Sequence, residues 1–327
     1  MRVFFGLTAL GCSETVPPAP VAAPVVVAEA EPDLPQPPKG FSDIGMVRVP
    51  GGLVELGPRH GAGMPEKPGP GPLPKYVSTR PREQPPSAWN NHAGMGLARR
   101  KAKVKPFLID RTEVTQAAYA GFVEEAGYRP PHVAEAWADS GWNWSGTRGP
   151  EGKESHPVTL VSFHDAQAYC TWRGKRLPTE AEWQLAALGP AEARRSFPWG
   201  ARYRAERLNH GQLTAPHTDD SDGHEWTAPV GQYPEGRSPY GLDDMFGNAW
   251  EYTSDLRIDD WSQARHEGFE VDGAMRNVTA AGPGLRVAVR GGSFYFDFEP
   301  NPGGEWSAFV PESRRKSAGF RCAAELK

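Results

Sequence analysis

Oxygen-donating side chains in turn-rich loops are the groups of this sequence best suited to bind a metal ion. Asp244 and Glu251 flank the turn formed by Phe246, Gly247 and Asn248. A hard cation such as Ca²⁺ takes carboxylate, amide and backbone carbonyl oxygens from flexible chain segments. The residues alone leave an alternative open, because the two acids could equally be solvated side chains or capping groups.

Histidine and cysteine are the residue types that would bind a redox-active metal. The chain has nine histidines, but no His-x-x-x-His pair lies on a recognisable helix; the candidates include His156, His164, His210, His217 and His224. Its three cysteines are Cys12, Cys170 and Cys322. With Cys12 set aside, an even pair remains, which fits an exported protein but could also be two buried free thiols.

The N-terminus resembles an export signal. Residues 1–12 carry one positive charge, then a short apolar run and small residues before Cys12, which is the layout of a bacterial lipoprotein signal. The apolar run is too short to span a bilayer. The alternatives are a mis-assigned start or a buried N-terminal strand.

A tether follows the signal. From Ser13 to Gly40 the chain is dominated by Pro, Ala and Val, which predicts an extended, polyproline-like spacer. We therefore expect a signal over residues 1–12, a tether over 13–41 and one folded domain over 42–327. A lipid on Cys12 would anchor that domain to a membrane, in the bacterial periplasm or at the cell surface.

Composition narrows the class of protein. The net charge of −4 and the lack of a large basic cluster give no electrostatic reason to expect nucleic acid. The 11 Trp, 14 Phe and 9 Tyr residues supply bulky apolar area for a core. The 37 Gly and 34 Pro residues predict much turn and loop.

Three helices are predicted from their starting signals. Thr115 can cap a helix that ends at Gly127. A second helix begins at Ser162 and a third at Thr179, each with an acid at capping-box spacing. Alternating apolar residues on either side of a Gly-Gly bend predict a hairpin-like pair of short strands over 46–57. The Pro- and Gly-rich stretch 58–96 reads as a surface insertion, so these elements predict an irregular α+β domain.

Several long motifs occur in one order along the chain: Pro157–Ser162, Arg176–Trp183, Phe197–Gly200, Tyr240–Tyr252, Val289–Phe296 and Ser317–Cys322. Together they resemble the formylglycine-generating enzyme (sulfatase-modifying factor) family, over about Met46 to Ala324. The resemblance implies a compact fold related to C-type lectins and low in regular secondary structure. It also implies a structural disulfide between Cys170 and Cys322.

The family resemblance further implies two structural calcium sites, each built from two side-chain oxygen donors and two backbone carbonyls. The matching residues of the first site are Asn209, Asp222, His210 and His224. Those of the second are Asp244, Glu251, Gly247 and Ala249. Calcium is the one cofactor that this resemblance leads us to expect.

Catalytic members of the family carry a copper-binding cysteine pair, and here the matching positions hold Phe296 and Asn301. Neither side chain can replace a thiolate, so we expect no copper. Trp250, Ser293 and Arg321 match positions that line or support the substrate groove. The alternative is that Trp250 is a core residue and Arg321 is paired internally.

The leading hypothesis is an exported, lipid-anchored, calcium-stabilised domain that binds a protein or glycan partner without redox catalysis, a pseudoenzyme of the family. Trp137, Trp142 and Trp144 could form the contacting patch, or they could be buried packing. The alternative function is a metal-dependent oxidase or hydroxylase of the same superfamily that uses another metal, such as histidine-bound iron. In either case His156, just before Pro157, is expected to be structural.

Overall fold

The computed structural model describes residues 42–56, 100–139, 141–212, 218–258, 285–296 and 306–326, which all lie in the unit Leu34–Lys327. The expected signal with Cys12, the tether and the insertion 58–96 lie outside these residues, as do His217 and Asn301. In the part that is described, no helix combines the length and the apolar character needed to cross a membrane.

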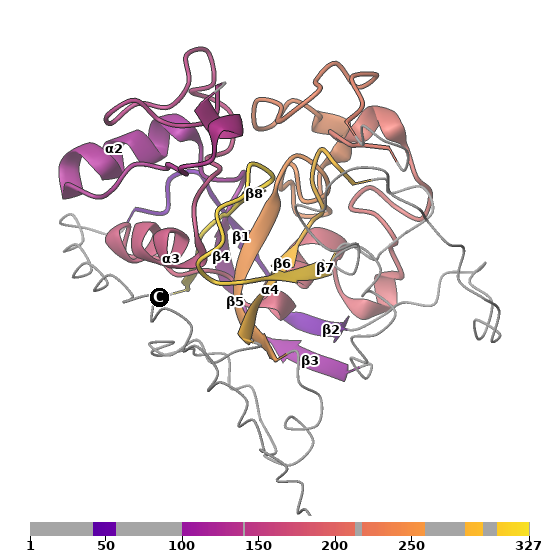
Figure 1. Cartoon of the computed structure of the whole chain (residues 1–327). Coiled ribbons are helices and arrows are strands. Elements are labelled where there is room, and N and C mark those ends of the chain that lie inside the picture. The colour runs from indigo at the N-terminus through magenta and orange to yellow at the C-terminus, as the bar shows by residue number, and fades with distance from the viewer. Residues whose placement is uncertain are drawn as a thin grey trace, which may run out of the picture. The chain divides into compact units, whose positions relative to one another are not determined.

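The described residues form short strands and helices joined by long loops (Figure 1). The α-helices are α2 (Gln116–Ala126), α3 (Phe163–Trp172) and α4 (Glu180–Leu188). Single-turn 3₁₀ helices are η1 (Ala136–Asp139), η2 (Ala191–Ala193), η3 (Ala205–Arg207) and η4 (Pro234–Gly236). The strands are β1 (Met46–Val49), β2 (Gly52–Leu56), β3 (Arg100–Val104), β4 (Phe107–Asp110), β5 (Trp250–Ile258), β6 (Leu285–Arg290), β7 (Trp306–Phe309), β8 (Ala318–Gly319) and β9 (Ala323–Glu325).

The strands pair into three small sheets. Their orders are β1-β4-β9, β2-β3 and β7-β6-β5-β8. Neighbouring strands run antiparallel except β5 and β8, which pair in parallel. This mixture of short helices and small sheets confirms the predicted α+β class with modest regular structure.

The helix starts confirm the predicted capping signals. Thr115 Oγ1 accepts the N–H of Ala118 at 3.2 Å, and α2 ends at Gly127 with a left-handed φ of 64°. The other two helices both begin with a capping box. In α3, for example, Asp165 Oδ2 accepts the Ser162 N–H at 2.7 Å, and Ser162 Oγ accepts the Asp165 N–H at 3.2 Å. Local side-chain hydrogen bonds therefore set these boundaries.

The predicted hairpin over 46–57 is wrong, although both of its strands exist. β1 pairs with β4 and β2 pairs with β3, so the two strands enter different sheets. Between them, a Cβ on Gly51 would lie 2.6 Å from the Val104 carbonyl oxygen, so the backbones cross too closely for a side chain. The alternating pattern identified strands but carried no information about their partners.

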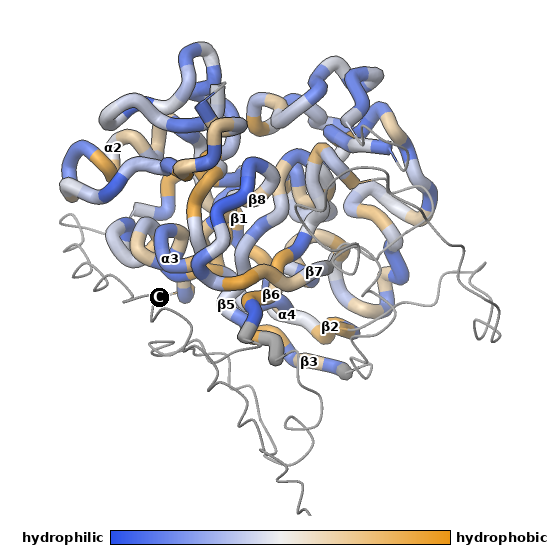
Figure 2. Tube along the Cα trace, viewed as in Figure 1, coloured by the Kyte–Doolittle hydropathy of each residue, from blue (hydrophilic) through white to orange (hydrophobic). Residues whose placement is uncertain are grey.

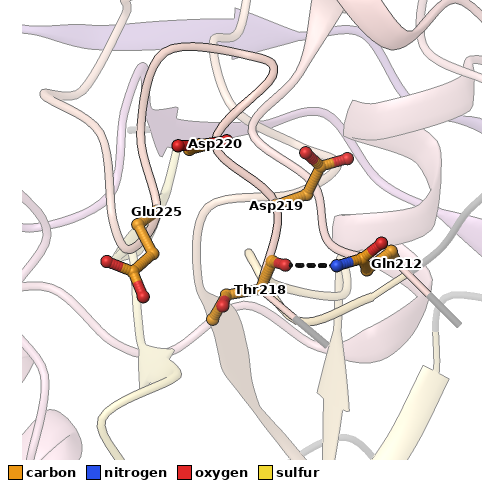
Figure 3. A pocket seen from close by; sticks show the side chains of 5 residues that line it. All are labelled: Gln212, Thr218, Asp219, Asp220 and Glu225. Carbon is orange, nitrogen blue, oxygen red and sulfur yellow. Dashed lines mark hydrogen bonds between the residues drawn. The ribbon is translucent and has the colours of Figure 1, made fainter. Parts of the chain in front are cut away.

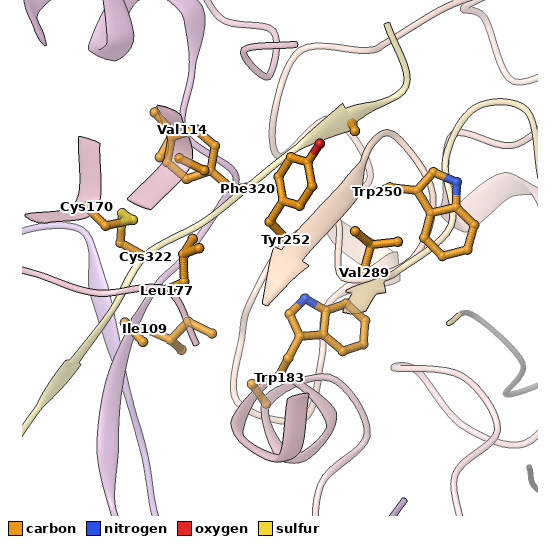
Figure 4. Packing of buried hydrophobic residues seen from close by; sticks show 14 of the residues in the cluster. Ile109, Val114, Cys170, Leu177, Trp183, Trp250, Tyr252, Val289, Phe320 and Cys322 are labelled. Carbon is orange, nitrogen blue, oxygen red and sulfur yellow. A yellow bond between two sulfur atoms is a disulfide. The ribbon is translucent and has the colours of Figure 1, made fainter. Parts of the chain in front are cut away.

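The core lies between the sheets and α4. Helix α4 contacts β2, β3, β5 and β6, and its Trp183 is fully buried (Figure 4). Hydrophobic stretches lie near the labels of β2, β6 and β7, whereas many of the outer loops are hydrophilic (Figure 2). The expected disulfide joins Cys170 in α3 to Cys322 before β9, with 5.6 Å between their Cα atoms.

Candidate functional site

A buried ion pair lies at the centre of the site. Arg321 has no exposed surface, and its Nε and Nη2 donate to Glu251 Oε2 and Oε1, each at 2.7 Å. Trp183 Nε1 also donates to Glu251 Oε2, at 2.8 Å. The remaining Arg321 donors reach the carbonyls of Asp110, Arg111 and Asp243. Arg321 is thus paired internally and supports the site from within.

Two further carboxylates surround this pair. Burial, and then the charge of Asp244, raise the pKa of Glu113 well above its usual range. Burial likewise raises the pKa of Asp244 to about 6. Glu113 Oε2 is buried without a hydrogen-bond partner. Three carboxylates around one guanidinium leave excess negative charge when all are ionised, so a cation nearby would stabilise the ionised form.

Sequence reasoning did not identify Glu113 as a site residue. It stands two residues before the α2 cap, and its loop context carries no signal of burial. Its Oε1 accepts a hydrogen bond from Asn248 Nδ2 at 3.0 Å. Asn248 belongs to a motif that carries the family resemblance, whereas nothing in the sequence around Glu113 indicates that it contacts that motif.

The turn at Gly247 brings the two expected calcium loops into contact. A Cβ on Gly247 would lie 2.1 Å from the Asn209 carbonyl oxygen, and its φ is 86°. Only glycine fits such an approach. The same Asn209 carbonyl accepts the Asn248 N–H at 3.1 Å. Asn209 and Gly247, one from each expected ligand set, therefore lie against each other.

The first expected calcium site is assembled by hydrogen bonds. The Asp222 carboxylate accepts the backbone N–H of His210 at 2.8 Å and of His224 at 2.9 Å. Asn209 Nδ2 donates to the Trp226 carbonyl at 2.7 Å, but Asn209 Oδ1 is buried with no partner. An orphaned amide oxygen in a loop with a carboxylate is a donor set that fits a hard cation.

The second expected site is already partly neutralised by protein groups. Asp244 Oδ2 accepts the Gly231 N–H at 2.5 Å, and Glu251 is held by Arg321 and Trp183. Gly247 and Ala249 lie in the buried turn between the two acids. These residues fit a cation by charge, but the Glu251 carboxylate has a counterion in the protein itself.

Phe296 lies where the resemblance implies the first copper ligand. Its ring centroid is 5.7 Å from that of Trp250, edge to face, and both side chains are buried. Ser293 is fully buried, and its Oγ accepts the Tyr295 N–H at 3.3 Å. The two cysteines of the described residues are joined in the disulfide. These residues do not fit a copper–thiolate centre.

Comparison with known proteins decides the family. A sequence model of the sulfatase-modifying factor enzyme 1-like domain matches residues 31–326. The chain belongs to this family. It is 32% identical over 321 residues to the formylglycine-generating enzyme of Thermomonospora curvata, with 86% of this chain and 93% of that protein covered.

An inactive member is similarly close. The inactive C-alpha-formylglycine-generating enzyme 2 of Bos taurus is 32% identical over 260 residues, covering 69% of this chain and 79% of that protein. Among solved structures, PvdO from Pseudomonas aeruginosa superposes with a TM-score of 0.54 at 23% identity, covering 86% of this chain and 94% of that one. That likeness concerns the fold, which is the fold of the family.

His156 is buried and packed against neighbouring side chains. His156 Nδ1 lies 3.0 Å from Thr227 Oγ1, and burial together with the nearby Lys153 lowers the pKa of His156 to about 4. Its ring centroid is 6.4 Å from that of His224. Within the described ranges, no three His, Cys, Asp or Glu side chains are arranged to hold a metal ion.

The three candidate tryptophans separate into two environments. Trp144 is buried and packs edge to face on Tyr119 at 5.9 Å, so it belongs to the core. Trp142 instead packs on Trp226 at 5.6 Å, while Trp137 is 42% exposed.

Residues close to Trp226 in the sequence line a polar pocket. Figure 3 shows its lining, which is Gln212, Thr218, Asp219, Asp220 and Glu225. Its volume is about 290 Å³, and Gln212 Nε2 donates to the Thr218 carbonyl across one wall at 2.8 Å. Three of the five lining side chains are carboxylates, so the pocket is acidic.

Proposed function

We propose that this chain is a non-catalytic member of the family and that it acts by binding a protein or glycan partner. The observation that carries the proposal is Phe296, whose ring packs on Trp250 at the position of an expected copper ligand. A phenyl ring offers no donor to copper(I), which selects thiolates. The family's oxidation of a substrate cysteine therefore has no metal centre of the known kind in this chain.

The retained scaffold supports a binding role. The Arg321–Glu251 pair and the disulfide cross-link the interior, while Trp137 is an aromatic side chain exposed at the surface. Scaffold and site change independently in protein families. The inactive bovine relative is, by its name, a family member without the catalytic activity.

Calcium and a membrane anchor belong to the same proposal. The orphaned Asn209 Oδ1 and the excess negative charge around Asp244 support structural calcium. The signal-like N-terminus supports lipidation of Cys12, which would place the domain on a bacterial membrane in the periplasm or at the cell surface. The acidic net charge of −4 does not favour nucleic acid as the partner.

A peptide oxidation assay tests the loss of catalysis. The purified protein, with copper added, is incubated with a Cys-x-Pro-x-Arg peptide and the product is analysed by mass spectrometry. We expect no formylglycine above the protein-free background, with an active family enzyme as the positive control. An aldehyde product above that background would overturn the proposal.

Metal analysis tests the alternative, an oxidase or hydroxylase with another metal. Calcium without a transition metal supports the non-catalytic function. Stoichiometric iron or copper that remains after dialysis would favour the alternative and contradict our proposal.

A further inference from the structure

The ammonium group of Lys316 lies among four aromatic rings. Its Nζ is 4.1 Å from the ring centroid of Trp226, 5.1 Å from Tyr295, 5.5 Å from Trp142 and 5.9 Å from Trp137. We call these four rings the aromatic cage. They come from three segments that are far apart in the sequence, one of which includes the 3₁₀ helix η1, so only the tertiary structure assembles them.

The cage is built from packed rings, with one open side. Trp142 and Trp226 meet edge to face at 5.6 Å, and Phe294 packs behind them at 6.3 and 5.7 Å. Trp137 is 42% exposed, so the cage reaches the surface. Trp142, Trp226 and Tyr295 are only partly buried.

Among the described residues, the four rings are the direct contacts of the Lys316 ammonium group, and the charge of Glu225 also acts on it. The described residues give its nitrogen no hydrogen bond or ion pair, in contrast to Lys175, whose Nζ is 2.6 Å from Asp110 Oδ1. Cation–π and long-range charge interactions set no single geometry, so Lys316 can leave the rings without breaking a directional hydrogen bond.

One carboxylate, that of Glu225, acts on the cage electrostatically. The charge of Glu225 raises the pKa of Tyr295 in addition to the effect of burial, and it opposes the lowering of the Lys316 pKa by burial. Glu225 also lines the acidic pocket together with Asp219 and Asp220. Aromatic faces with carboxylates beside them attract cations, because both present negative potential.

We propose that the aromatic cage is a binding site for an ammonium or methylated ammonium group of an external ligand, and that Lys316 is a built-in competitor which this group displaces. The inference deepens the proposed binding role and rests on it. Aromatic cages of this kind recognise quaternary ammonium and methyl-lysine groups in other proteins. Here the ligand would enter past Trp137, with Glu225 balancing its charge.

Titration with tetramethylammonium, followed by tryptophan fluorescence at constant ionic strength, tests the site. The probe binds only molecules whose cage is free of Lys316. Its apparent Kd is therefore its intrinsic Kd divided by the fraction of molecules with a free cage. If Lys316 fills the cage about nine-tenths of the time, Lys316→Met should lower the Kd about tenfold. In that background, Trp226→Leu should abolish binding and Glu225→Gln should weaken it.

Lys153→Met is the matched control, because Lys153 is another half-buried lysine that lies outside the cage. It should bind the probe as the wild type does. The proposal is overturned if Lys316→Met binds no more tightly than this control; Lys316 would then be a packing contact only.

A second measurement uses the wild-type protein and does not depend on the folding of any variant. Displacement by tetramethylammonium should expose the Lys316 amine and raise its rate of acetylation, measured by mass spectrometry, while Lys153 stays unchanged. An unchanged Lys316 rate at saturating probe would contradict displacement. Either failure would leave the peptide oxidation result intact. An aldehyde product in that assay would instead overturn the proposed function, whatever the probe titration shows.

Discussion

At the scale of single residues, the charge of Arg321 is the feature with the largest energetic consequence. Removing a guanidinium from water costs several kcal/mol, and its bidentate contact with Glu251 offsets that cost only while both partners remain. The pair also links β5 to the segment between β8 and β9. Replacing either residue with an uncharged one leaves the other charge buried and without this hydrogen-bonded partner.

We therefore predict that Glu251→Gln lowers the free energy of unfolding by about 3–5 kcal/mol, because Arg321 would lose its bidentate, hydrogen-bonded counterion and keep only weaker charge contacts such as Glu113 Oε2, 3.9 Å from its Nη2. Urea denaturation followed by circular dichroism measures the change. The matched control is Glu325→Gln: Glu325 contacts Arg176 at 2.7 Å, but its side chain is 72% exposed. That exposed pair should be worth at most about 1 kcal/mol. If both substitutions lowered the free energy of unfolding equally, the buried pair would stabilise the protein no more than the exposed pair does.

At the scale of elements, the disulfide connects helix α3 to the segment that leads into β9. Cys170 lies in α3, and Cys322 lies beside β9, which pairs with β4. The two cysteines are 152 residues apart, so the bond closes a long loop in the unfolded chain.

Replacing both cysteines with serine should lower the free energy of unfolding by roughly 3–5 kcal/mol, because the unfolded chain would regain the entropy of that loop. Thermal and urea denaturation measure the change, and reduced wild-type protein is the control, expected to lose a similar amount. Peptide mapping under non-reducing conditions gives an independent check. If both thiols were free in the oxidised protein, the predicted stabilisation would have no source.

At the scale of the whole molecule, calcium would act where the two ligand loops meet. The backbones of Asn209 and Gly247 are in close contact, so an ion in either loop would stabilise the irregular chain around both. Replacing Glu251 is a poor test of calcium binding, because the substitution also removes the hydrogen-bonded partner of Arg321. Asp222 lies in the first loop, away from that pair, and serves better.

A chelator should lower the melting temperature of the wild type, since calcium at a hundredfold excess over its Kd stabilises the native state by about 2.7 kcal/mol. Asp222→Asn should abolish most of this response, measured by differential scanning calorimetry with and without calcium. Asp220→Asn, an exposed acid in the same loop, is the control and should respond as the wild type does. Identical melting curves with and without chelator would contradict calcium binding.

The sequence by itself determined the features that depend on near neighbours or on residue identity. The capping boxes at Ser162 and Thr179 involve groups three residues apart, so their hydrogen bonds follow from local geometry. The exchange of a thiolate for Phe296 was equally plain, because a side chain's donor atoms do not depend on the fold. The motifs that indicated the family also indicated the disulfide of Cys170 and Cys322.

Only the tertiary structure decided which distant groups share a space. Glu251 and Arg321 are 70 residues apart and Glu113 is farther still, so nothing local distinguishes a buried, paired acid from a solvated one. The partners of β1 and β2 were hidden for the same reason, since alternation shows a buried face but not what covers it. Lys316 reads in the sequence as one of several basic residues in a loop. Its place among tryptophans from distant loops follows from the packing of those loops, which depends on the whole chain.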